Sequence, residues 1–255
     1  MTALHAEWTK LRSLRSTTWA LLAIVVFTVA FGAVSASTSH TEGRAVEGSN
    51  GQSVAVISLA GVYFAQVAAV ALGVMAMCGE YAGGTIRATF AANPRRRQVV
   101  GAKVAVVGAL LLAACATASV AAFYVGRAIL SGNGFTPQNG YPAVSLTDGP
   151  TLRTVAVAAV YPVVLALLSL GVATILRHTA AAISLVLGAL FVPWIVGALL
   201  PHDLGLAIEK ASPMVGLAAQ EEGAPIGHWA GFGITAAWAA AALVVALWLI
   251  ARRDA

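Results

Sequence analysis

The chain has 255 residues, of which 59% are hydrophobic and only 10% are charged. A soluble domain carries about 25% charged residues, so this composition excludes an ordinary soluble globular protein. The net charge of +5 would suit a nucleic-acid-binding protein, but the basic residues are divided among the connections between apolar stretches, which argues against nucleic acid as a partner.

Six long apolar stretches fill most of the chain. Because about 20 helical residues cross the hydrocarbon core of a bilayer, each stretch is long enough to span it. The stretches are continuously apolar, whereas membrane strands alternate. We therefore predict an all-α polytopic membrane protein, with six transmembrane helices and a short N-terminal amphipathic interfacial helix, forming one transmembrane domain over residues 1–255. The expected spans are 18–36, 54–78, 99–125, 155–176, 179–200 and 229–251.

The segment before the first span, residues 2–16, has the pattern of a short amphipathic helix. Such a helix lies in the headgroup layer with its apolar face towards the lipid tails, and Trp8, Lys10 and Arg12 would anchor it there. A plain basic flank that only orients span 1 explains the same residues. A signal peptide cleaved near Ala36 is a weaker alternative, because the leading segment is long. The apolar residues near one face are Leu4, Trp8, Leu11 and Leu14.

Polar residues are sparse inside the second and third spans. Tyr63 and Gln66 lie about one turn apart near the middle of the second, where they would either line a substrate path or form a hydrogen bond between helices. Lys103 lies one turn into the third span and is expected to snorkel towards the headgroups. Glu80 lies where the second span ends, and we expect it to pair with a basic residue such as Arg87 or Arg97.

The connection between spans 2 and 3, residues 79–98, has a local pattern of its own. Gly83 and Gly84 permit a sharp reversal of the chain, and Thr85 is suited to cap a short helix that follows. Ile86 and Phe90 would then present a small apolar face at helical spacing. Three consecutive arginines follow, which would bind lipid phosphates or acidic groups of a partner, or act only as topology anchors. They are Arg95, Arg96 and Arg97.

Lysine and arginine collect at both termini and in every second connection, including the tight turn at Arg177 and His178. The positive-inside rule then places both termini in the cytoplasm. Two cysteines in or beside apolar spans are more typical of small packing residues than of a disulfide. The basic residues outside this pattern are Arg44, Arg127, Arg153 and Lys210.

Several motifs of enzymes do not occur in the sequence. It contains neither the Gly-x4-Gly-Lys-Ser/Thr phosphate loop nor the His-Glu-x-x-His motif of zinc proteases, and no Gly-x-Ser-x-Gly elbow. No charged residue lies at the centre of a span, where a proton- or sodium-coupled carrier commonly needs one. We therefore expect the chain itself to bind no ATP and no cofactor, and to draw its energy from another subunit.

The segment from Glu80 to Lys103, EYAGGTIRATFAANPRRRQVVGAK, resembles the loop after the second span in bacterial ABC-2 type permeases. Those loops show an acid, a Gly-Thr pair, an apolar turn, then proline with arginine and a later lysine. The opening EWTKLRS, residues 7–13, resembles the start of actinobacterial members. The resemblance implies that a short coupling helix docks onto an ATPase. The coupling residues it implies are Glu80, Gly83, Gly84, Thr85, Ile86, Arg87 and Phe90.

As a whole, the resemblance implies the membrane-spanning permease subunit of an ATP-driven ABC exporter in the bacterial cytoplasmic membrane. ATP and magnesium would bind to a separate ATPase subunit, and two permeases, as a homodimer or a heterodimer, would work with two ATPases among membrane lipids. A secondary transporter or channel-like protein is the main alternative. An intramembrane enzyme is a weaker one, because no nucleophile or metal-binding constellation stands out.

Overall fold

The computed structural model describes residues 3–41, 52–92, 96–141, 143–221, 224 and 226–252. It is 85% helical, and its described residues form no strand, so the predicted all-α class is confirmed. Six of the described helices are long and apolar enough to cross a membrane. They are α2 (Arg15–Thr38), α4 (Val62–Ala82), α6 (Arg96–Gly132), α7 (Gly149–Leu176), α8 (Thr179–Leu199) and α11 (His228–Arg252).

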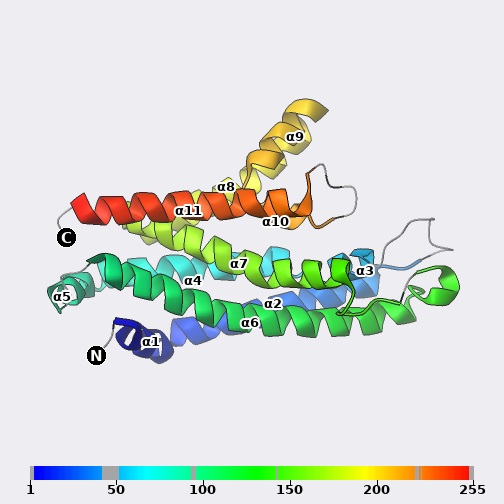
Figure 1. The fold of residues 1–255 in the computed structure, drawn as a ribbon, viewed down its shortest axis with the longest axis horizontal. Helices are drawn as coiled ribbons and strands as arrows, with labels where there is room; N and C mark the ends of the chain where they lie inside the picture. The colour runs from blue at the N-terminus through cyan, green and yellow to red at the C-terminus, as the bar shows by residue number, and fades with distance from the viewer. Residues whose placement is uncertain are drawn as a thin grey trace.

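Short helices cap the two ends of this bundle. Helix α1, α5 and the last turn of α11 lie at one end, which we call the α1 end, whereas α3 and α10 lie at the other (Figure 1). Helix α9 projects away from the bundle beyond α8 (Figure 1). These elements are α1 (Ala3–Ser13), α3 (Gln52–Ser58), α5 (Thr85–Ala92), the 3₁₀ helix η1 (Pro137–Asn139), α9 (His202–Ala211) and α10 (Val215–Ala218).

The second apolar stretch is divided, which corrects the expected single span 54–78. Helix α3 ends at Ser58, a turn follows, and α4 begins at Val62. Gly61 lies at this turn, and a Cβ at its position would collide with the carbonyl oxygens of Phe27 and Thr28 on α2. The chain therefore meets α2 backbone to backbone here, as small residues permit between membrane helices.

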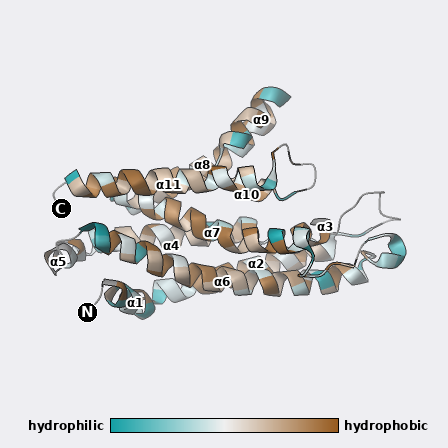
Figure 2. Cartoon of the chain, in the orientation of Figure 1, coloured by the Kyte–Doolittle hydropathy of each residue, from teal (hydrophilic) through white to brown (hydrophobic). Residues whose placement is uncertain are grey.

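Helices α4 and α7 form the centre of the bundle, and most of their apolar residues are buried. A close approach holds them together, since a Cβ at Gly73 would collide with the carbonyl oxygen of Ala166 on α7. Ser169 adds a hydrogen bond from its hydroxyl to the carbonyl oxygen of Val70, at 3.0 Å. Helices α2, α8 and α11 are peripheral, since only 22% of the most apolar window of each is buried, so hydrophobic residues run along the outside of the bundle (Figure 2).

We expect both termini on the cytoplasmic side, and cysteine accessibility tests this orientation. Single reporter cysteines should be introduced after Cys78 and Cys115, both buried and unpaired, have been replaced. Labelling of the α1 end by a membrane-impermeant thiol reagent added outside would contradict the orientation. Reporters at positions 47, 139 and 221 should be labelled, and those at positions 12, 96 and 252 should be protected. Position 47 lies outside the described residues.

Candidate functional site

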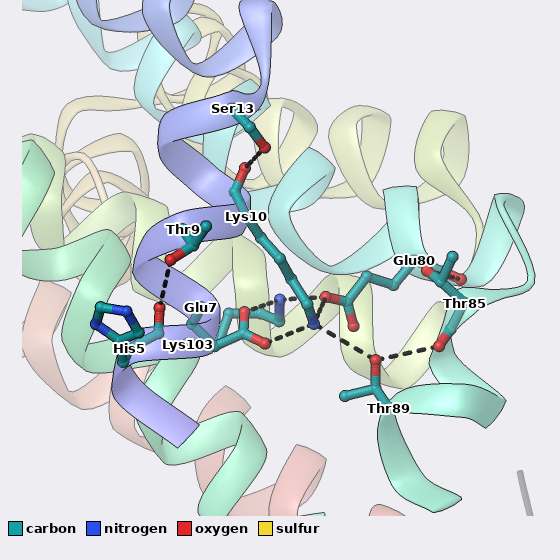
Figure 3. Close-up of polar contacts among 9 residues, drawn as sticks. All are labelled: His5, Glu7, Thr9, Lys10, Ser13, Glu80, Thr85, Thr89 and Lys103. Carbon is teal, nitrogen blue, oxygen red and sulfur yellow. Dashed lines mark hydrogen bonds and ion pairs between the residues drawn. The ribbon is translucent and has the colours of Figure 1, made fainter. Parts of the chain in front are cut away.

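Four charged side chains from three separate helices meet at the α1 end (Figure 3). Helix α1 contributes Glu7 and Lys10, the end of α4 contributes Glu80, and α6 contributes Lys103. The ammonium of Lys103 lies 2.5 Å from Oε2 of Glu7 and 2.8 Å from Oε1 of Glu80. That of Lys10 lies 2.8 Å from Oε1 of Glu7 and 3.0 Å from the same Glu80 oxygen. We call these four residues the ion-pair cluster.

Burial makes the ion-pair cluster more demanding than a surface salt bridge. The side chains of Glu7 and Lys103 are only 3% and 2% exposed. A charge removed from water is tolerated only when oppositely charged and hydrogen-bonding groups surround it. Lys10 is partly exposed, and burial lowers its pKa, but the hydrogen bonds and charges of Glu7 and Glu80 outweigh this effect and raise the pKa above its ordinary value. The cluster therefore fixes α1 firmly against α4 and α6.

One expectation about these charges was wrong, and another is confirmed only in its general form, because Glu80 pairs with basic residues other than Arg97. Lys103 does not snorkel to the surface, because its ammonium is held in the interior by two carboxylates. The described partners of Glu80 are Lys10 and Lys103, and no ion pair joins it to Arg97. The side chain of Arg87, the other expected partner, lies outside those described. Sequence reasoning also missed Glu7, although a lysine inside an apolar stretch signals that an acid must lie near it.

The reversal after α4 forms as predicted. Gly84 has φ +66°, a left-handed conformation that favours glycine, and α5 begins at the next residue. The expected short helix is present, but Thr85 is its first residue and not the cap before it, and the Thr85 hydroxyl donates to the backbone carbonyl of Glu80 at 3.4 Å. The hydroxyl of Thr89 on α5 accepts a hydrogen bond from Lys10 at 3.4 Å, which connects α5 with the ion-pair cluster.

The expected exposure of Ile86 on an apolar face of α5 is not observed. Ile86 is buried in the core, so its side chain anchors α5 to the bundle and is not exposed for docking. The side chain of Phe90 lies outside those described, and its docking contact stays a prediction. Among the side chains of α5 that the structure describes, the exposed ones are small: Thr85, Ala88 and Ala91.

The expected anchoring residues surround this end of the molecule. Trp8 and Arg12 on α1 are exposed, Arg97 is exposed on the first turn of α6, and Arg96 beside it is partly buried. Arg95 lies outside the described residues. Among the apolar residues of the predicted amphipathic segment, Leu11 packs into the core, while Leu4 and Trp8 of α1 and Leu14 just after it remain exposed.

Tyr63 and Gln66 lie away from this end and connect helices. Buried Gln66 receives a hydrogen bond from the hydroxyl of Tyr161 on α7 at 3.1 Å, and its amide donates to the backbone carbonyl of Tyr63. The Tyr63 hydroxyl donates to a carboxylate oxygen of Glu221 at 3.0 Å. A cavity beside Tyr63 holds only about 20 Å³. The geometry of Gln66 is that of a hydrogen bond between helices, and a role in a substrate path stays a prediction.

The fold defines a multi-pass α-helical membrane protein with a charged cluster and a short helix at one end. The family model described as "ABC-2 family transporter protein" matches residues 3–192, which include α1, α5 and the whole ion-pair cluster. The chain belongs to this family, so it is a permease component of an ABC transporter, and membership of the family implies a partnership with an ABC ATPase. None of the curated proteins or solved structures compared with the chain matches it.

Proposed function

We propose that the chain is the permease subunit of an ATP-driven exporter. A separate ATPase subunit, which itself binds ATP and magnesium, would dock at the α1 end. The family membership supports the ABC transporter, and the missing phosphate loop favours a second chain for ATP hydrolysis. The resemblance of the segment 80–103 to permease loops favours α5 as the ATPase contact. Two permeases with two ATPases would form the working assembly in the bacterial cytoplasmic membrane, with both termini inside.

The observation that carries this proposal is the connection of α5 to the bundle. Helix α5 follows α4 after a two-glycine turn, is anchored by buried Ile86, and is joined through Thr89 and Lys10 to α1. A displacement of α5 would therefore reach α4 directly and α6 through Lys103. Packed helices move as bodies and do not deform continuously, which suits the transmission of motion from an ATPase to the spans.

The exposed face of α5 has the shape that a docking helix needs. Thr85, Ala88 and Ala91 are spaced three residues apart, so they follow one face. Small side chains let another backbone approach closely. An ATPase groove could therefore contact the helix along this face while Ile86 holds its opposite side in the core.

A first test concerns the source of the energy. We expect the purified chain alone to neither bind nor hydrolyse ATP, because it has no phosphate loop. A tagged copy isolated from its native membrane should co-purify with a phosphate-loop ATPase. Vesicles that contain both subunits should transport substrate only when ATP is present on the side that corresponds to the cytoplasm. ATP hydrolysis by the chain alone, after contaminants have been removed, would contradict the proposal. Transport driven by an ion gradient without ATP would favour the secondary transporter instead.

A further inference from the structure

A cleft of about 480 Å³ opens beside the ion-pair cluster, lined by α1, the start of α2, the end of α4, Thr85 of α5 and Lys103 of α6. Small-molecule sites commonly have volumes of roughly 300–1,000 Å³, so the cleft is large enough to hold a ligand. The cleft reaches Thr85 at the start of α5 and lies apart from the polar residues around Gln66. Its occupant can be inferred from the order of polar and apolar groups along its wall.

The wall of the cleft is apolar on the side that faces the membrane interior. Met75 and Ala76 line it about one turn before Glu80 on α4, and Leu11 of α1 and Leu14, between α1 and α2, line it from the other side. Met75 and Leu14 are exposed, so the cleft reaches the outer surface of the bundle. The cleft therefore runs from a lipid-facing part of α4 to the charges at its end. This order matches an amphiphile whose tail lies towards the bilayer and whose head lies against the ion-pair cluster.

The charges at the cleft select the head of that amphiphile. Both lysines use Oε1 of Glu80, and both oxygens of Glu7 are already paired. Oε2 of Glu80 is buried and has no hydrogen-bond partner among the described residues. A buried acceptor without a donor is unfavourable, and an ammonium with N–H donors is the complementary group.

A second part of the cleft favours an anion. Ser16, in the first turn of α2, lines the cleft together with partly exposed Lys10. The first turn of a helix carries unpaired backbone N–H groups and the positive end of the helix dipole. The cleft thus offers a carboxylate oxygen for a cation and, beside it, the ammonium of Lys10 and the first turn of α2 for a phosphate, while the four charges of the ion-pair cluster sum to zero.

We propose that this cleft binds a phospholipid of the adjoining leaflet whose head is phosphoethanolamine. The ammonium donates to Oε2 of Glu80, the phosphate lies by Lys10 and the first turn of α2, and one acyl chain follows Leu14 and Met75. An anionic glycerol lipid would bring no cation to Glu80. A choline lipid keeps the positive charge but has no N–H to donate. The site adjoins the proposed ATPase contact at Thr85 but does not include Ala88 or Ala91, and it holds whether or not the protein is an exporter.

The selectivity can be measured by native mass spectrometry of the delipidated full chain in detergent. Phosphatidylethanolamine, phosphatidylcholine and phosphatidylglycerol with identical acyl chains should be titrated separately. We expect the ethanolamine lipid to bind at least about tenfold more tightly than the other two, because only its head satisfies both parts of the cleft. Soluble glycerophosphoethanolamine at the same concentration should not displace it, since it has no acyl chains. Equal affinity for the three lipids, or displacement by the soluble head, would overturn the proposal.

A pair of glycine variants locates the site. Gly79 lines the cleft, and a Cβ at this position would meet nothing within 4 Å, so Gly79→Leu fills the cleft without replacing a charge. Gly101 is the matched control, because it is exposed on α6 at the same end and a Cβ there also meets nothing within 4 Å. We expect Gly79→Leu to lose the preference for the ethanolamine lipid and Gly101→Leu to keep it, with unchanged melting temperatures. The same preference in both variants would place the lipid elsewhere and refute the assignment.

Discussion

Replacement of Lys103 by methionine is expected to destabilise the protein by roughly 3–5 kcal/mol, because it leaves buried carboxylates without their cation. The side chain of Glu7 is only 3% exposed, and its Oε2 would lose its partner. Glu80 would retain Lys10 alone. The loss corresponds to a fall of roughly 10 °C in the melting temperature of a chain of this size. Thermal unfolding in detergent, followed by circular dichroism, measures it.

A double variant separates the charge from the shape of the lysine. Glu7→Gln combined with Lys103→Met removes one charge of each sign, so it should be more stable than Lys103→Met alone even though it carries two substitutions. Lys210→Met is the control, since Lys210 lies on α9 and makes none of the ion pairs found among the described residues. If Lys103→Met melts like the parent protein, the ion pairs are not what holds α1 in place.

The helices themselves were predictable because their cause is local. A continuous apolar run longer than the bilayer core predicts a span whatever its neighbours are. The reversal before α5 was equally visible, because consecutive glycines permit a left-handed residue such as Gly84. The division between α3 and α4 was not visible. Gly61 reads as an ordinary small residue in an apolar run, and only the approach of α2 to its Cα gives it a special role.

The candidate site was predicted in part for the same reason. Glu80 stood out from the apolar sequence before it, so its importance could be inferred, but its partners could not. Lys103 is 96 residues from Glu7, and only the docking of α1 against α6 brings them together. Burial of Ile86 was missed because helical spacing identifies which residues share a face, and not whether that face points to the bundle or away from it.

The remaining prediction concerns the coupling of α5 to an ATPase, and two variants divide it into docking and transmission. Ala88→Trp adds a large side chain to the exposed face of α5, so it should reduce association with the ATPase at least about tenfold without unfolding the bundle. Ala207→Trp is the matched control, because Ala207 is an exposed alanine on the short helix α9. Co-purification of the tagged chain with its ATPase measures the effect.

Glu80→Gln acts on transmission instead. It keeps the size of the side chain but removes the charge that both lysines share, so the connection of α4 to α1 and α6 weakens while the exposed face of α5 is unchanged. We therefore expect normal co-purification of the ATPase, with transport reduced at least several-fold for each ATP hydrolysed. Glu209→Gln on α9 controls for the loss of an acid remote from the ion-pair cluster. If Ala88→Trp still retains the ATPase and Glu80→Gln still transports like the parent, then α5 is only a link between α4 and α6 beside basic residues. Motion from the ATPase must then reach the bundle by another route.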